Sequence, residues 1–107
     1  MMTLSELFDP APARWGLRGD PHLWAELREA LRGASLPASE QALAALIAQT
    51  FKRLTGAPLA GREPIYVARL NHGGMSGGYV DPRFWGDRAI PLLCARYRAA
   101  ADAGQPQ

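Results

Sequence analysis

The sequence is poor in side chains that bind metal ions or form covalent cross-links. Its one cysteine, Cys94, excludes an internal disulfide and a metal site built from several thiolates. Its two histidines, His22 and His72, are too few to form a metal centre by themselves. We therefore expect no metal ion and no other cofactor, and we interpret Cys94 as a small residue of the core.

Long apolar runs are also missing from the sequence. No stretch approaches the roughly 20 consecutive apolar residues that a membrane-spanning helix needs. Residues 1–6 lack the basic segment followed by an apolar segment that is typical of a secretory leader. We therefore expect a cytoplasmic protein that has no contact with a membrane.

Charge of one sign is not concentrated anywhere in the chain. Twelve basic residues against ten acidic residues give a formal net charge of +2, and the pI is near 9.1. All the basic residues except Lys52 are arginines, and they are interspersed with acidic residues rather than gathered in a tract. Nucleic acid is therefore not the expected partner, because binding to its phosphates needs a basic patch or stripe.

The overall composition is typical of a small globular protein. Hydrophobic residues make up 48% and charged residues 21% of the 107 residues, which argues against general disorder. A chain of this length forms one modest core and has no room for a second. We expect a single domain over residues 1–107, with an ordered N-terminal segment at 1–19 and a frayed tail at 103–107.

Apolar spacing and end signals predict three main helices. Asp20 followed by Pro21 has the pattern of a helix start, in which a carboxylate caps free backbone amides. Ser39 and Gly56 provide the start and the stop of the strongest of the three helices. The predicted ranges are 20–32, 39–55 and 82–101, and a short helix through Phe8 precedes them.

The segment 64–70 is rich in β-branched and aromatic residues and is too short for a stable helix, so it predicts a strand. Its only nearby partner is the short segment 78–80, across a glycine-rich connection. The predicted fold class is therefore α+β, a mostly helical domain whose three main helices pack on a small antiparallel β-hairpin. An open edge of that hairpin would accept another chain, so a homo-oligomer is one alternative.

A five-residue pattern occurs twice, at 20–24 and at 81–85. Each copy consists of an aspartate, a proline, a basic residue, a large apolar residue and a tryptophan. We interpret the copies as two helix starts with the same capping chemistry, because the residues beyond them do not align well. The helix that follows the second copy contains Gly86 and Pro91, so we expect it to bend or restart near one of them.

The stretch LNHGGMSGGYV, residues 70–80, places four glycines directly after the predicted strand. Within it, residues 74–78 match the G-x-S-x-G pattern of a hydrolase, with Ser76 as the nucleophile and His72 as the base. That pattern needs a helix immediately after the serine, whereas here the next helix starts only at Asp81. We therefore interpret the run mainly as a turn whose glycines supply positive φ angles.

An anion-binding role for the same run is the alternative, since backbone amides of glycine-rich turns form nests for anions. The residues it would use are Asn71, His72, Gly73, Gly74 and Ser76. No lysine follows the run and no helix begins directly after it, so neither the P-loop pattern nor the dinucleotide-binding pattern is present. This alternative would make the chain a small-molecule or anion-binding enzyme or sensor.

Aromatic and arginine residues in or near the predicted loops point instead to a protein partner. Accessible tryptophan, tyrosine and arginine residues dominate the energetics of protein interfaces. The candidate contact residues are Trp15, Arg18, Arg83, Trp85 and Arg88. The competing interpretation places the tryptophans in the core, as is usual in a small domain. Because the sequence shows no catalytic constellation, we favour a non-enzymatic binding protein.

The segments RWGLRGDPHLW at 14–24 and NHGGMSGGYVDPRFW at 71–85 resemble small uncharacterised bacterial proteins of about this size. The resemblance extends over most of the chain and assigns no catalytic residues. Such proteins are often immunity proteins, which bind the toxin domain of a polymorphic or contact-dependent toxin and block it. The resemblance therefore implies a toxin domain as the partner. Inhibitors of nuclease toxins are often acidic, so this slightly basic chain would bind away from the cleft or meet an acidic surface.

Overall fold

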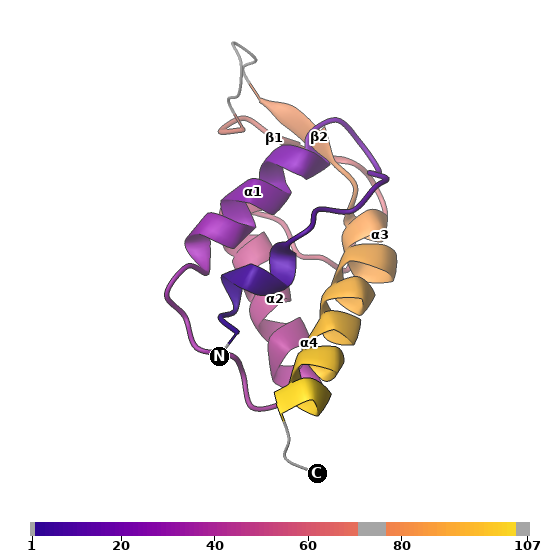
Figure 1. The fold of residues 1–107 in the computed structure, drawn as a ribbon. Coiled ribbons are helices and arrows are strands. Elements are labelled where there is room, and N and C mark those ends of the chain that lie inside the picture. Colours follow the sequence, from indigo (N-terminus) through magenta and orange to yellow (C-terminus); the bar gives the residue numbers. More distant parts are fainter. Residues whose placement is uncertain (1, 71–76, 105–107) are drawn as a thin grey trace.

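The computed structural model describes residues 2–70 and 77–104 of the chain. Over these residues it is an α+β fold, with helices packed below a two-stranded antiparallel sheet at one end of the molecule (Figure 1). This arrangement confirms the predicted fold class. The elements, in chain order, are a 3-10 helix Ser5–Phe8, α1 Asp20–Ala30, α2 Glu40–Thr55, β1 Ile65–Val67, β2 Gly78–Val80, α3 Pro82–Phe84, a π-helical turn Trp85–Ala89 and α4 Ile90–Gly104.

The helix α2 begins and ends as its sequence predicts. The hydroxyl of Ser39 accepts a hydrogen bond from the backbone N–H of Ala42 at 3.1 Å. Gly56 ends the helix in the left-handed conformation, with a φ of 78°, and its N–H donates to the carbonyl of Lys52. The apolar face between these two ends is buried in the core.

The helix α1 is shorter than predicted and begins differently. It ends at Ala30, and Gly33 follows with a φ of 82°. Gly19 occupies the N-cap position, and no side chain caps the first turn. The prediction that Asp20 caps this helix is therefore wrong, because its carboxylate is engaged by other segments of the fold.

The third predicted helix consists of α3, the π-helical turn and α4 in succession. Asp81 caps α3 as predicted, by accepting a hydrogen bond of 3.0 Å from the N–H of Arg83. The N–H of Ile90 bonds to the carbonyl of Trp85, five residues earlier, and Pro91 directly after it has no N–H to donate. The wider turn therefore lies where a proline interrupts the α-helical hydrogen bonds, in the region where the sequence predicts a bend or a restart.

The strands β1 and β2 pair in antiparallel register, with Tyr66 opposite Tyr79. The alternation of strand residues buries Val67 and Val80 on one face and leaves both tyrosines exposed on the other. The N–H of Gly19 donates to the carbonyl of Tyr79 at 2.8 Å, so the loop before α1 lies along the outer edge of β2. The hairpin lies at the end of the molecule remote from the C-terminus (Figure 1).

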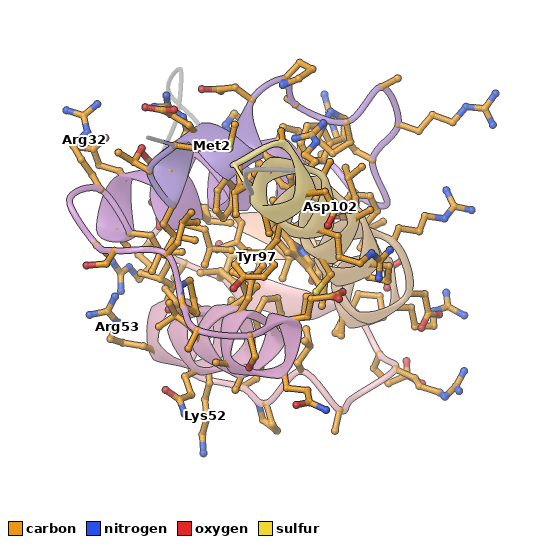
Figure 2. All side chains as sticks on the ribbon, turned by 60° about the horizontal axis from the view of Figure 1, so that its bottom comes forward. Met2, Arg32, Lys52, Arg53, Tyr97 and Asp102 are labelled. Carbon is orange, nitrogen blue, oxygen red and sulfur yellow. The ribbon has the colours of Figure 1, made fainter. Side chains whose placement is uncertain are left out.

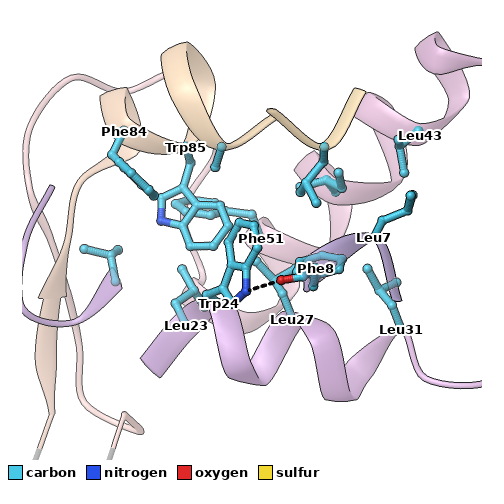
Figure 3. Close-up of a cluster of buried hydrophobic side chains, with 14 of the residues drawn as sticks. Leu7, Phe8, Leu23, Trp24, Leu27, Leu31, Leu43, Phe51, Phe84 and Trp85 are labelled. Carbon is cyan, nitrogen blue, oxygen red and sulfur yellow. Dashed lines mark hydrogen bonds between the residues drawn. The ribbon is translucent and has the colours of Figure 1, made fainter. Parts of the chain in front are cut away.

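One cluster of buried side chains joins the helices, the 3-10 turn and the inner face of the hairpin. Its centre is aromatic: the ring centroid of Trp85 lies 6.0 Å from that of Trp24 and 5.9 Å from that of Phe51 (Figure 3). Trp24 donates its indole N–H to the carbonyl of Phe8 at 3.1 Å. This hydrogen bond ties the N-terminal turn to α1.

Charged side chains are distributed over several elements. Lys52 and Arg53 on α2, and Arg32 beyond the end of α1, extend away from the core (Figure 2). Ion pairs among the described residues join Arg28 to Asp9, Arg32 to Glu29, Arg83 to Asp81 and Arg98 to Glu40. Over residues 2–70 and 77–104, no helix combines the length and the apolarity that crossing a membrane requires.

Candidate partner-binding surface

The five candidate contact residues lie in different environments. Trp85 is 0% exposed, because its ring packs in the aromatic centre of the core, and the expectation that a partner could reach it is wrong. Trp15 is half-buried, with its ring against those of Trp24 and Phe84. The other three candidates, Arg18, Arg83 and Arg88, are exposed.

The candidate ligand residues of the glycine run, Asn71, His72, Gly73, Gly74 and Ser76, lie outside the described residues. Leu70 and Gly77, on either side of these residues, are joined by a hydrogen bond: the N–H of Gly77 donates to the carbonyl of Leu70 at 2.8 Å. Gly77 has a φ of 94°, which L side chains rarely adopt, so this glycine supplies the positive φ that a turn needs. Gly78 is instead a residue of β2. A ligand-binding role for the run stays a prediction.

A buried carboxylate joins the loop before α1 to the second Asp-Pro motif. Asp20 is 0% exposed, and one of its oxygens accepts a hydrogen bond from the N–H of Leu17 at 2.6 Å. The other oxygen accepts from the N–H of Asp81 at 3.0 Å and from the indole N–H of Trp85 at 2.9 Å. We name this arrangement the Asp20 junction. It fixes the loop, the start of α3 and the core relative to one another.

Burial raises the pKa of the Asp20 carboxyl above its ordinary value of 3.8. The three hydrogen bonds act in the opposite direction, because each donor stabilises the charged form, and the neighbouring charge of Asp81 adds to the upward shift. The upward effect of burial on this pKa is larger than the downward effect of the hydrogen bonds. The folded chain therefore binds a proton at Asp20 more tightly than the unfolded chain does.

Two glycines allow the loop 15–19 to approach the rest of the fold closely. A Cβ on Gly19 would overlap the carbonyl oxygen of Tyr79, to which Gly19 donates its N–H. A Cβ on Gly16 would lie 2.8 Å from an oxygen of Asp20, which is too close for an unshifted side chain. The segment between the two glycines therefore has its position fixed at both ends.

Residues of this loop and of the hairpin line an open groove of about 500 Å³. We name it the tyrosine groove. Its lining residues are Leu17, Arg18, Pro64, Tyr66, Gly77, Gly78 and Tyr79. Tyr66 is 53% exposed and Tyr79 is 54% exposed, and their ring centroids lie 5.3 Å apart in an edge-to-face contact. The volume is within the range of about 300–1,000 Å³ that is usual for binding pockets.

A second hollow, of about 290 Å³, lies at the start of α3 and contains charges of both signs. Its residues are Gly16, Asp81, Arg83, Phe84, Asp87 and Arg88. The Nε of Arg83 lies 3.7 Å from a carboxylate oxygen of Asp81. Arg83 and Arg88 therefore belong to this polar hollow, and Arg18 is the one predicted contact residue that lines the tyrosine groove.

Tyr66 and Tyr79 are contact candidates that are not among the contact residues predicted from the sequence. Their signal is the alternation within the short strands, which places each tyrosine on the face opposite its flanking residues. Alternation separates the two faces but does not say which one is covered. The core covers the valine face, and only the tertiary structure shows this.

Cys94 and His22 provide no second candidate site among the described residues. Burial raises the pKa of the Cys94 thiol and the nearby Glu40 carboxylate raises it further, so this thiol stays protonated at neutral pH. Glu26 lies one helical turn after His22 on α1, but residues 2–70 and 77–104 contain no group of three side chains that would hold a metal ion. The tyrosine groove is therefore the strongest candidate site among these residues.

Comparison of the chain with models of protein families, with curated proteins and with solved structures gave no match. The resemblance of its two motif segments to small bacterial proteins stays a prediction. Function has to be inferred from the geometry of the described residues together with that resemblance.

Replacing Asp20 with asparagine should destabilise the fold. The amide keeps the size of the carboxyl group, but its NH2 would face a backbone or indole donor and leave that donor without an acceptor. We expect the free energy of unfolding to fall by about 1–3 kcal/mol in urea denaturation. The control Asp87→Asn, at an exposed carboxylate, should change it by less than about 0.5 kcal/mol. Equal effects of the two substitutions would contradict the role of the Asp20 junction.

The stability difference between the native chain and Asp20→Asn should depend on pH. Because the folded-state pKa of Asp20 is raised, its contribution to stability grows as the pH falls through that pKa, and it becomes constant below 3.8. Urea denaturation of both proteins between about pH 7 and about pH 4 should show the native chain gaining stability relative to the variant. A native chain that loses stability relative to the variant over this range would show that the pKa is lowered instead.

Gly19→Ala should separate the loop from the hairpin. The added methyl group would overlap the Tyr79 carbonyl, so the hydrogen bond between them must lengthen or break. We expect a loss of about 1–3 kcal/mol in the free energy of unfolding. Gly86→Ala is the matched control, because apart from its chain neighbours and its own helix backbone nothing lies within 4 Å of the added Cβ, and it should be neutral or slightly stabilising. Equal stability of the two variants would show that the close approach is not required.

Proposed function

We propose that the chain is a non-enzymatic protein-binding module and that it acts as an immunity protein, which binds a bacterial toxin domain and inhibits it. The observation that carries the binding role is the tyrosine groove, where two tyrosines, each more than half exposed, lie beside the arginine Arg18. The step from a binding protein to an immunity protein is supported by the resemblance of residues 14–24 and 71–85 to small bacterial proteins.

The chemistry of the tyrosine side chain supports a protein partner. Each tyrosine offers a large apolar ring and a polar hydroxyl, and few torsions have to be fixed when it binds. The contact between the rings of Tyr66 and Tyr79 already restricts both side chains. Contiguous exposed apolar surface is uncommon on soluble proteins and often marks an interaction site. The pair therefore has the properties of an interface anchor.

The loop side of the groove supports tight binding because it is held in place before a partner arrives. The N–H of Leu17 bonds to Asp20, and the N–H of Gly19 bonds to Tyr79. A surface that is already ordered loses little conformational entropy on binding, and its affinity is correspondingly higher. The partner would meet a preformed groove rather than a loop that must fold around it.

Inhibition by occlusion requires contact and no chemistry. A standard interface buries about 800 Å² on each partner, with an apolar centre and a polar rim. The tyrosine groove would supply the centre of such an interface. The polar hollow with Arg83 and Arg88 shares the 15–19 loop with the groove and would contribute to the rim.

The test combines capture of a partner with an assay of toxicity. The tagged chain is used to isolate a stoichiometric partner from its native host, and the partner is identified by mass spectrometry. Expression of the partner alone in a bacterial host should arrest growth, and co-expression of this chain should restore it. Tyr66→Ala combined with Tyr79→Ala should abolish both capture and protection.

Met2→Ala is the control for the double tyrosine variant. Met2 is 41% exposed and lines a hollow together with residues of α4 and not of the hairpin, so its loss should leave capture and protection intact. A partner that binds all variants equally would remove the tyrosine groove from the proposal. A partner without toxicity would overturn the immunity role, and the absence of any stoichiometric partner would overturn the binding role.

A further inference from the structure

We infer that the tyrosine groove binds a peptide segment of the partner in which apolar side chains lie next to a carboxylate. This inference rests on the proposed binding function and names the partner chemistry at the same site. Tyr66 and Tyr79 would receive the apolar side chains of the segment. Arg18, at the same groove, would pair with one of its carboxylates.

The charge of the groove has one sign. Among the described residues that line it, Arg18 is the only charged one, and none is a carboxylate. Arg18 is exposed and, like several other arginines, forms no ion pair with the described residues; what sets it apart is its place in an apolar groove. An unpaired cation beside apolar surface is complementary to an anionic group on a partner that is otherwise apolar.

The carboxylates of the Asp20 junction do not neutralise Arg18. The oxygens of Asp20 are buried and accept hydrogen bonds from Leu17, Asp81 and Trp85. The side chain of Asp81 caps α3 and lies 3.7 Å from Arg83. Both acidic groups are therefore engaged within the fold, and the positive charge of Arg18 is left for a partner.

The backbone on both sides of Arg18 is fixed by hydrogen bonds. The N–H of Leu17 donates to Asp20 at 2.6 Å, and the N–H of Gly19 donates to Tyr79 at 2.8 Å. This fixed backbone holds the base of the Arg18 side chain beside the apolar part of the groove. The groove would therefore recognise apolar side chains and a carboxylate together, and not acidity alone.

The size and composition of the groove favour a peptide segment over nucleic acid. A volume of about 500 Å³ accommodates a few side chains of a partner. Nucleic acid gains its affinity from several phosphate contacts, and a single arginine supplies too few of them. The tyrosine rings would make the apolar contacts that a peptide offers.

The inference is tested with three short fluorescent peptides that differ only in charge, made of leucine alternating with aspartate, with asparagine or with lysine. Fluorescence anisotropy measures the affinity of each peptide for the full chain. The aspartate peptide should bind most tightly, and Arg18→Glu should weaken its binding about tenfold, because an attraction is replaced by a repulsion. Arg53→Glu, at an exposed arginine of α2, is the matched control and should leave the affinity unchanged.

Thermal melting of both variants checks that they remain folded, and Arg18→Ala provides a second loss of the charge. Three outcomes would overturn the inference. They are equal affinity for the aspartate and asparagine peptides, no binding of the aspartate peptide, and tighter binding of a single-stranded DNA oligonucleotide. A toxin partner whose binding does not depend on Arg18 would leave the proposed function standing and remove only this inference. Charge-dependent binding of the aspartate peptide would support it even if the captured partner proved non-toxic.

Discussion

The carboxylate of Asp20 lies where three parts of the fold meet, and each part supplies one of the donors that surround it: Leu17 from the loop before α1, Asp81 from the start of α3, and Trp85 from the core. Removing a carboxylate from water is unfavourable unless donors are arranged to receive it. The raised pKa of Asp20 shows that its burial outweighs these hydrogen bonds. The hydrogen bond from the indole of Trp85 joins this carboxylate to the aromatic core, so the junction and the core are in direct contact.

The two Asp-Pro motifs have the same residue pattern and different roles because they meet in space. Asp81 caps its own helix through the N–H of Arg83, as the pattern predicts. Asp20 leaves its helix without a side-chain cap and instead accepts hydrogen bonds from the second motif. The two tryptophans differ in the same way, since Trp24 donates to a backbone carbonyl and Trp85 to a carboxylate. The repeated pattern thus couples the starts of α1 and α3.

The surface that we propose for partner binding is built on the same contacts. The loop that carries Arg18 is attached to the Asp20 junction on one side and to β2 on the other. The proposed binding surface and the core are therefore held by the same carboxylate, since Leu17 and Trp85 both donate to Asp20. This arrangement explains why Trp85 is covered and the two strand tyrosines are exposed: Trp85 lies on the inner side of the junction, whereas Tyr66 and Tyr79 lie on the outer face of the hairpin.

The sequence by itself determined the features that depend on neighbouring residues. The start of α2 at Ser39 and its end at Gly56 follow from contacts within a few residues. The hairpin joins two segments that are adjacent in the sequence pattern, and with the helices it defines the fold class. Only the tertiary structure decided the acceptor role of Asp20, the burial of Trp85 and the exposed pair of tyrosines. Asp20 and Trp85 are 65 positions apart, and the covered face of the hairpin is set by helices elsewhere in the chain. Local patterns carry no information about such contacts, because packing between distant segments creates them.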